Sequence, residues 1–156
     1  MSKRKLSLGV VSMALVAMAI SEASAQDASP RYGRWQMDSD APPPSINIMT
    51  YEPYGDGGMK ITVASTNARG QDGEWGYVTM FDGEFHAVTG RENVDTAVEF
   101  VDAQTTRITN MTNGRVTQVI INTLSEDGNT INNEYVRLDE NGKIRGVGHA
   151  VYRRIH

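Results

Sequence analysis

The sequence predicts an all-β fold, an antiparallel up-and-down meander of about 8–10 strands that closes into a barrel. Segments rich in Ile, Val, Thr, Tyr and Phe alternate with short breaks that contain Gly, Asn or Asp. Several breaks hold the dipeptides typical of tight hairpins, among them Asp82-Gly83, Asn113-Gly114, Asp127-Gly128 and Asn141-Gly142. No window of about eleven or more residues keeps a 3.6-residue apolar period, which argues against amphipathic helices.

Residues 1–25 have the three parts of a secretory signal peptide. A basic head at 3–5 precedes an apolar stretch at 6–20, and Ala23-Ser24-Ala25 provides the small-x-small cleavage pattern. The apolar stretch is shorter than the ~20 residues that span a bilayer. We therefore expect export to the periplasm or the extracellular space, cleavage before Gln26, and no membrane span afterwards.

The rest of the chain is expected to form one domain. Residues 26–44 are an N-terminal segment, with a loose start at 26–32, a first short strand within 33–38 and a Pro-rich linker at 40–44. Residues 45–156 are the barrel body and form one domain with the strand at 33–38. Further strands are expected at 46–52, 59–66, 74–80, 85–89, 96–101, 105–111, 116–124, 130–138 and 145–153.

The faces of these strands favour a barrel over its competitor, a two-sheet sandwich. Short hairpins join neighbouring strands, and closure of the meander removes both edges. In 130–138 one face carries Ile131, Asn133, Tyr135 and Arg137, and neither face of this strand is cleanly apolar. A sandwich would show a sharper alternation of apolar and polar residues. Polar groups on both faces favour an interior that holds one small ligand.

Composition excludes several classes of function. The net charge is −4, and no run of Lys or Arg follows residue 5, which argues against nucleic acid as a partner. The absence of Cys excludes disulfides and thiol catalysis. Signatures of serine hydrolases, nucleotide-binding enzymes and zinc proteases are missing as well. We expect no cofactor and no metal, since a zinc site of His86, His149 and a glutamate would lack a close-spaced ligand pair.

Turn and strand motifs resemble those of a known family. Gly33-Arg34-Trp35 resembles the Gly-x-Trp opening of lipocalins, in which the tryptophan closes the barrel floor. The pattern from Tyr32 to Tyr152 is similar to exported bacterial lipocalin-like, calycin-type proteins; His86-Ala87 replaces the Tyr-Pro pair usual in that group. The motifs that carry this likeness are 51–57, Phe81-Asp82-Gly83, Val88-Thr89-Gly90, 127–130 and Val151-Tyr152. The resemblance implies a lipocalin-like barrel around a small ligand.

Six residues are the candidates for binding that ligand. Trp75 and Tyr77 share a strand face and suit an apolar or aromatic molecule. An inward arginine would hold a carboxylate by two hydrogen bonds, whereas an outward one would be solvated. A one-residue change of strand register would turn every inward side chain outward and every outward one inward. The sequence therefore leaves open whether each candidate points into the barrel or to solvent. The candidate ligand-binding residues are Trp75, Tyr77, His86, Arg107, Tyr135 and His149.

Three functions compete at this point. The leading one is an exported carrier or binder of a small, partly apolar molecule, either aromatic or carboxylate-bearing. The second is a cofactor-independent lyase or isomerase. In it His86 or His149 is the base, Tyr135 or Tyr77 is the acid or oxyanion donor, and Arg107 is the substrate anchor. The third is an interaction or inhibitor module of the envelope or extracellular space, which works through its outer face and loops.

Overall fold

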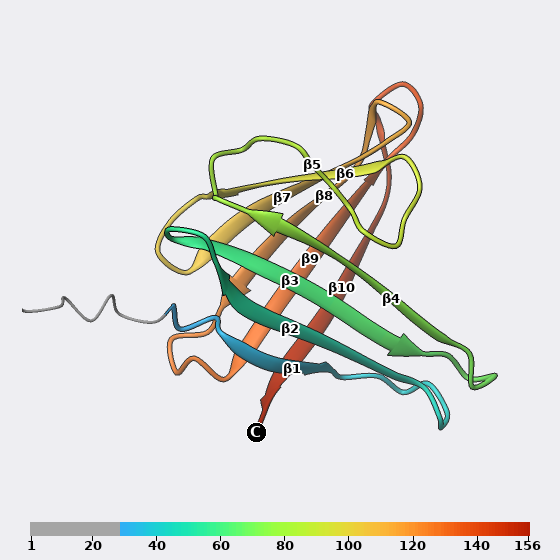
Figure 1. Ribbon diagram of the computed structural model, residues 1–156. Helices are drawn as coiled ribbons and strands as arrows, with labels where there is room; N and C mark the ends of the chain where they lie inside the picture. The colour runs from blue at the N-terminus through green and yellow to red at the C-terminus, as the bar shows by residue number, and fades with distance from the viewer. Residues whose placement is uncertain (1–28) are drawn as a thin grey trace, which may run out of the picture.

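The computed structural model describes residues 29–156, and the predicted signal peptide and its cleavage site lie outside this range. Within it, ten strands and no helix are present (Figure 1). No helix among these residues is long and apolar enough to cross a membrane. The strands are β1 (Gly33–Met37), β2 (Ile46–Tyr54), β3 (Gly58–Thr66), β4 (Asp72–Thr79), β5 (His86–Ala87), β6 (Val94–Phe100), β7 (Thr105–Thr112), β8 (Arg115–Leu124), β9 (Thr130–Leu138) and β10 (Ile144–Ile155).

All ten strands belong to one antiparallel sheet of order β4-β3-β2-β1-β10-β9-β8-β7-β6-β5. Every pair except β1–β10 joins neighbours in the sequence, so this is the predicted up-and-down meander. The predicted fold class is confirmed.

A narrow seam between β4 and the β5–β6 region nearly closes the sheet into a barrel. Gly76 and Thr89 exchange two backbone hydrogen bonds of 3.0 and 2.8 Å across it. Further along, the Gly83 amide donates to the Val98 carbonyl at 3.0 Å. These few bonds replace a continuous ladder, so the barrel closes along this line by isolated bridges.

One of the hairpin dipeptides has the predicted conformation at both residues. Asn113 and Gly114 have φ values of 50° and 75° and join β7 to β8 in a two-residue turn. In Asp82-Gly83, Asp127-Gly128 and Asn141-Gly142 only the glycine has a positive φ.

One predicted strand, 85–89, is shorter in the structure, because only His86 and Ala87 pair with β6 in register. The Val88 amide still donates to the Val94 carbonyl at 2.9 Å, and Thr89 then bonds to Gly76 across the seam.

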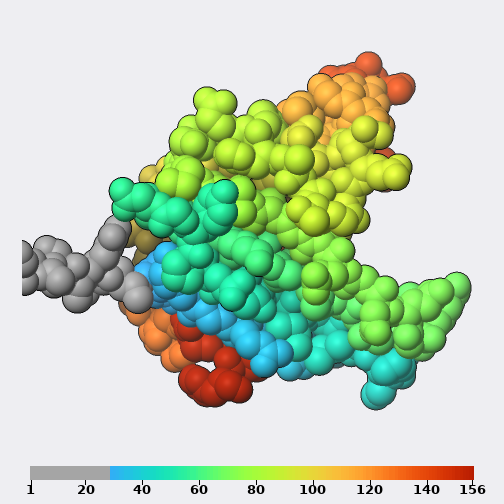
Figure 2. Space-filling view, viewed as in Figure 1, coloured from blue at the N-terminus to red at the C-terminus, as the bar shows by residue number. Residues whose placement is uncertain are grey.

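The two ends of the barrel differ. At one end the interior is filled by a core that includes Trp35, Tyr51, Leu124, Ile131 and Tyr152. At the other end the β1–β4 and β7–β10 halves diverge, and a notch lies between them (Figures 1 and 2). We call the first the closed end and the second the mouth.

Candidate functional site

A rank of polar side chains crosses the inner wall near the mouth. Strand register places Thr96 opposite Asn110, Asn110 opposite Gln118, and Gln118 opposite Arg137. Residues directly opposite each other share a face of the sheet. The Thr96 hydroxyl lies 2.7 Å from Asn110 Oδ1, and Asn110 Nδ2 donates to Gln118 Oε1 at 2.9 Å. This polar rank therefore forms a connected surface built from four strands.

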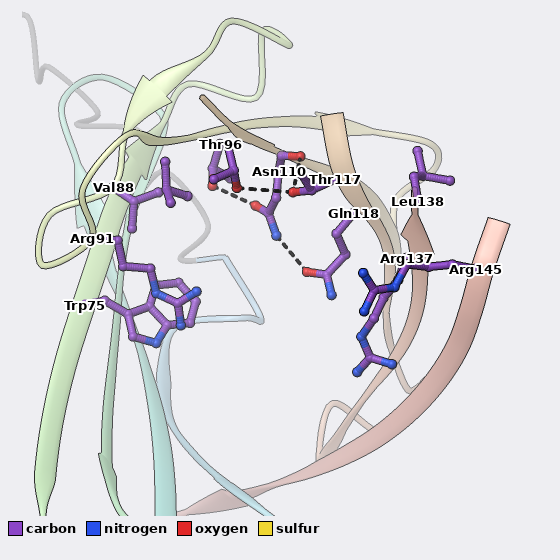
Figure 3. Close-up of a pocket in the computed structure, with 12 residues that line it drawn as sticks. Trp75, Val88, Arg91, Thr96, Asn110, Thr117, Gln118, Arg137, Leu138 and Arg145 are labelled. Atoms are coloured by element: carbon purple, nitrogen blue, oxygen red, sulfur yellow. Dashed lines mark hydrogen bonds between the residues drawn. The ribbon is translucent and has the colours of Figure 1, made fainter. Parts of the chain in front are cut away.

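The polar rank lines a cavity of about 300 Å³, which we call the arginine cavity. Figure 3 shows Trp75 and Arg91 on one side of it and Arg137 and Arg145 on the other. Its volume lies at the lower limit of ligand pockets in proteins. The remaining lining residues are Val88, Val94, Thr96, Asn110, Thr112, Thr117, Gln118 and Leu138.

The charge of this cavity is of one sign. Arg91, Arg137 and Arg145 line it, and no Asp or Glu does, although the whole chain is acidic. Arg137 lies against the backbone of Gly148, where an added Cβ would come within 3.3 Å of Nη1. A glycine at 148 thus leaves room for the guanidinium on the inner wall. The three guanidinium groups are open to solvent, which weakens but does not remove their attraction for an anion.

Aromatic surface faces these cations. The Trp75 ring stacks near Tyr77 with a centroid separation of 6.3 Å. The Arg91 guanidinium lies 4.2 Å from the centre of the Trp75 ring. Arg91 comes from the segment that crosses the seam, so this cation–π contact joins the two edges of the barrel. The site combines an indole wall with cationic and amide groups.

The closed end contains a buried hydrogen-bond network and no comparable space. Arg31 from the N-terminal segment is 4% exposed and donates to Asn122 Oδ1 and to the Gln104 carbonyl. Asn122 Nδ2 in turn donates to Asn133 Oδ1 at 2.7 Å, and Asn133 Nδ2 to the Tyr135 hydroxyl at 3.2 Å. Polar inward residues of β8 and β9 therefore bind one another here. Burial lowers the pKa of Arg31, since the surroundings disfavour its charge.

Trp75 alone of the six predicted ligand-binding residues lines the arginine cavity. Tyr77 points inward but is buried in the core, and Tyr135 belongs to the network of the closed end. His86 lies opposite Thr96 and so faces inward, with Nε2 buried and unpartnered.

Arg107 and His149 lie on the outer face. Arg107 forms an ion pair with Glu99, and His149 Nδ1 lies 2.7 Å from Glu134 Oε1. His86 and His149 therefore lie on opposite faces of the wall and do not share one cavity. Among residues 29–156, no three His, Asp or Glu side chains come together as metal ligands.

Sequence reasoning missed most of the site. Arg91, Arg145, Asn110 and Gln118 were not among the candidate residues, yet they line the cavity. The sequence does indicate that Asn110 and Gln118 are neighbours. They lie almost symmetrically about the Asn113-Gly114 turn, so a hairpin places them opposite each other. Arg91 had no such signal, because its position depends on the contact between the seam and Trp75.

Comparison with known proteins identifies the fold. No family model matches the chain, and no curated protein matches it in sequence. The fluorescent protein UnaG matches in structure, with a TM-score of 0.56, 12% identity, and coverage of 80% of this chain and 96% of UnaG. Its asparagine-to-alanine variant matches at 0.57, with 12% identity and coverage of 81% and 97%. Its asparagine-to-glutamine variant matches at 0.54, with 12% identity and coverage of 79% and 94%.

The barrel is lipocalin-like in its fold. At 12% identity the likeness to UnaG concerns the fold. The predicted resemblance of this chain to lipocalin-like barrels is thus confirmed for its architecture. Bacterial origin and export are not part of that comparison.

Proposed function

We propose that the protein binds a small, partly apolar molecule with an acidic group in the arginine cavity. The observation that carries the proposal is a cavity lined by three arginines and no carboxylate, with Arg137 and Arg145 across from the Trp75 ring and Arg91 stacked on that ring. A guanidinium donates two parallel hydrogen bonds to a carboxylate, and an indole offers a large apolar surface. Export into the periplasm or the extracellular space belongs to the same proposal and would place this binding outside the cytoplasm.

Each part of the ligand has a partner in this arrangement. The acidic group binds Arg137 and Arg145 on one wall. The apolar part lies against Trp75, Val88 and Leu138. Amide and hydroxyl groups of the polar rank orient the molecule between them.

Titration of the intrinsic tryptophan fluorescence with 4-methoxybenzoate tests the proposal. Trp35 is fully buried at the closed end, so quenching should come from Trp75 and disappear in Trp75→Phe. Loss of one charge-assisted hydrogen-bond pair at a solvent-open site should raise Kd about tenfold in Arg137→Ala. Kd should also rise with added salt.

Arg107→Ala is the matched control, because Arg107 lies on the outer face and pairs with Glu99. It should bind the acid as the wild type does. The same Kd in Arg137→Ala and Arg107→Ala, or no binding of the acid to the wild type, would refute the proposal.

A further inference from the structure

A second cavity lies at the mouth, on the projecting end of β1–β4, and its chemistry differs from that of the arginine cavity. Its volume is about 720 Å³. No Arg, Lys or His lines it; Asp72 is the one charged residue among the lining residues, and its Oδ1 accepts a hydrogen bond from Thr66 at 2.7 Å. The rest of the lining combines hydroxyl and amide side chains with the apolar residues Met37, Ala41, Ile46 and Ala68. We call this space the hydroxyl cavity.

Strand register puts the hydroxyl cavity next to Trp75. One inward rank of the sheet runs through Trp35, Met49, Val63 and Trp75. The next inward rank towards the mouth contains Asn47, Ser65 and Gly73, which face one another across β2, β3 and β4. Side chains two residues apart on a strand are about 7 Å from each other. A ligand that contacts Trp75 would therefore reach the hydroxyl cavity if it carried one additional ring.

Asn47 lines this cavity, but its side-chain oxygen is closed off from it. Oδ1 is buried and has no hydrogen-bond partner among the described residues. An occupant of the space would therefore bond to the accessible hydroxyl and amide groups of the other lining residues. Because Asp72 is present and Arg, Lys and His are not, the lining disfavours an anion.

We infer that the hydroxyl cavity is a subsite for an uncharged, hydroxyl-rich group such as a sugar, attached to the aromatic acid that the arginine cavity holds. The inference rests on the proposed function for the acidic half of the ligand. Hydroxyls of the sugar bond to accessible hydroxyl and amide groups of the lining, among them Ser65, which lies opposite Gly73. The natural ligand is then a glycoside of an aromatic acid rather than the free acid.

Two matched ligands test this inference. 4-Methoxybenzoate and 4-(β-D-glucopyranosyloxy)benzoate share the aromatic acid and differ only in a methyl or a glucosyl group. Two or three additional hydrogen bonds should make the glucoside bind about tenfold more tightly to the wild type. Equal affinity for the two ligands would overturn the inference.

Gly73→Phe is the variant that closes the subsite. A Cβ at Gly73 meets nothing nearer than Ser65 Oγ at 3.7 Å, so the strand tolerates a side chain there. The added ring should abolish the glucoside's advantage and leave the Kd of 4-methoxybenzoate unchanged. Glu74→Phe, one residue further on the outer face, is the control and should keep the advantage. An advantage that persists in Gly73→Phe would refute the subsite.

A separate measurement keeps this result distinct from failure of the proposed function. Methyl β-D-glucopyranoside carries no acid and no aromatic ring, so the arginine cavity is not needed to bind it. Saturation transfer from wild-type protein to this sugar, lost in Gly73→Phe, would support the subsite even if no aromatic acid binds. No transfer to the sugar from the wild type, together with equal affinity for the two benzoates, would contradict it.

Discussion

Tyr51 shows how the barrel interior changes the chemistry of a single side chain. Its phenol is 5% exposed and lies 3.4 Å from Asn122 Nδ2. Burial, which opposes the charged form, raises its pKa to about 12, although the nearby Arg31 charge and the Asn122 hydrogen bond act in the other direction. The pKa values of Tyr77 and Tyr152 are raised for the same main reason. These phenols remain protonated in the folded barrel.

The pH dependence of stability follows from this shift. The unfolded chain releases a proton from Tyr51 near its usual pKa of about 10, whereas the folded chain keeps it up to about 12. The stabilisation present below pH ~10 is therefore lost as the pH rises through ~12, by at most about 1.4 kcal/mol per pH unit for one such group. Tyr51→Phe should flatten the fall in the free energy of unfolding between about pH 10 and 12, measured by urea denaturation.

Tyr54→Phe is the control for this prediction, because Tyr54 is 44% exposed. Its pH profile should match that of the wild type. A Tyr51→Phe profile as steep as that of Tyr54→Phe would contradict the prediction.

At the scale of elements, the seam depends on a close approach of two backbones. Gly90 has a φ of 81°, and a Cβ there would lie 2.4 Å from the carbonyl oxygen of Glu74 in β4. A Cβ at Gly76 would lie 2.6 Å from the carbonyl oxygen of Ile61. Gly90 thus lets the segment after β5 bond to β4 and bring Arg91 over Trp75, whereas Gly76 permits the close approach of β4 to β3. The closure of the barrel and the shape of the arginine cavity share this contact.

Gly90→Ala should lower the free energy of unfolding by more than the cost of placing an alanine at a positive φ. Gly114 has a φ of 75° and no atom within 4 Å of an added Cβ, so Gly114→Ala measures the backbone cost by itself, about 1–2 kcal/mol. The clash with Glu74 should add at least about 1 kcal/mol in Gly90→Ala. Urea denaturation of both variants measures the difference. An equal decrease in the free energy of unfolding would contradict the prediction, because it would show that the seam accommodates the added methyl group.

For the whole molecule, the decisive feature is that one end of the barrel is filled and the other is open. Arg31 enters the closed end, and its carbonyl accepts a hydrogen bond from Trp35 Nε1 at 3.0 Å. Arg154 lies opposite Trp35 in the pairing of β1 with β10, and its guanidinium covers the ring at 4.1 Å from the ring centre. The sequence predicts a loose segment over 26–32, and the structure corrects this for Arg31, which is buried. The arginine cavity consequently lies at the mouth, away from the filled end.

Arg31→Met should lower the free energy of unfolding by about 1–3 kcal/mol. The substitution removes a buried charge but leaves Asn122 Oδ1 without its donor, whereas the Gln104 carbonyl keeps its hydrogen bond from the Leu124 amide at 2.9 Å. Arg34→Met is the control, because Arg34 is exposed on β1 and should change stability little. Thermal unfolding compares the two, and a melting temperature of Arg31→Met equal to that of Arg34→Met would show that the closed end does not need its arginine.

Local patterns predicted the strands and turns, and the binding residues only in part. The strand 130–138 has its predicted bounds, and Asn113-Gly114 has positive φ at both positions, since these features depend on neighbouring residues alone. Trp75 was a candidate that does line the cavity. The sequence does not distinguish Arg107 from Arg137, however, because both lie within predicted strands. Register places Arg107 on the outer face with Glu99, and Arg137 on the inner face against Gly148.

The antiparallel meander and its hairpins follow from local sequence, because alternation and turn conformation are properties of short segments. Long-range contacts set which face points inward, which end Arg31 fills, and where Arg91, Arg137 and Trp75 meet. Those outcomes depend on pairing β1 with β10 and on bridging β4 to the segment after β5, contacts between residues far apart in the chain. A period of two residues specifies that two faces exist, and closure of the barrel specifies which of them binds.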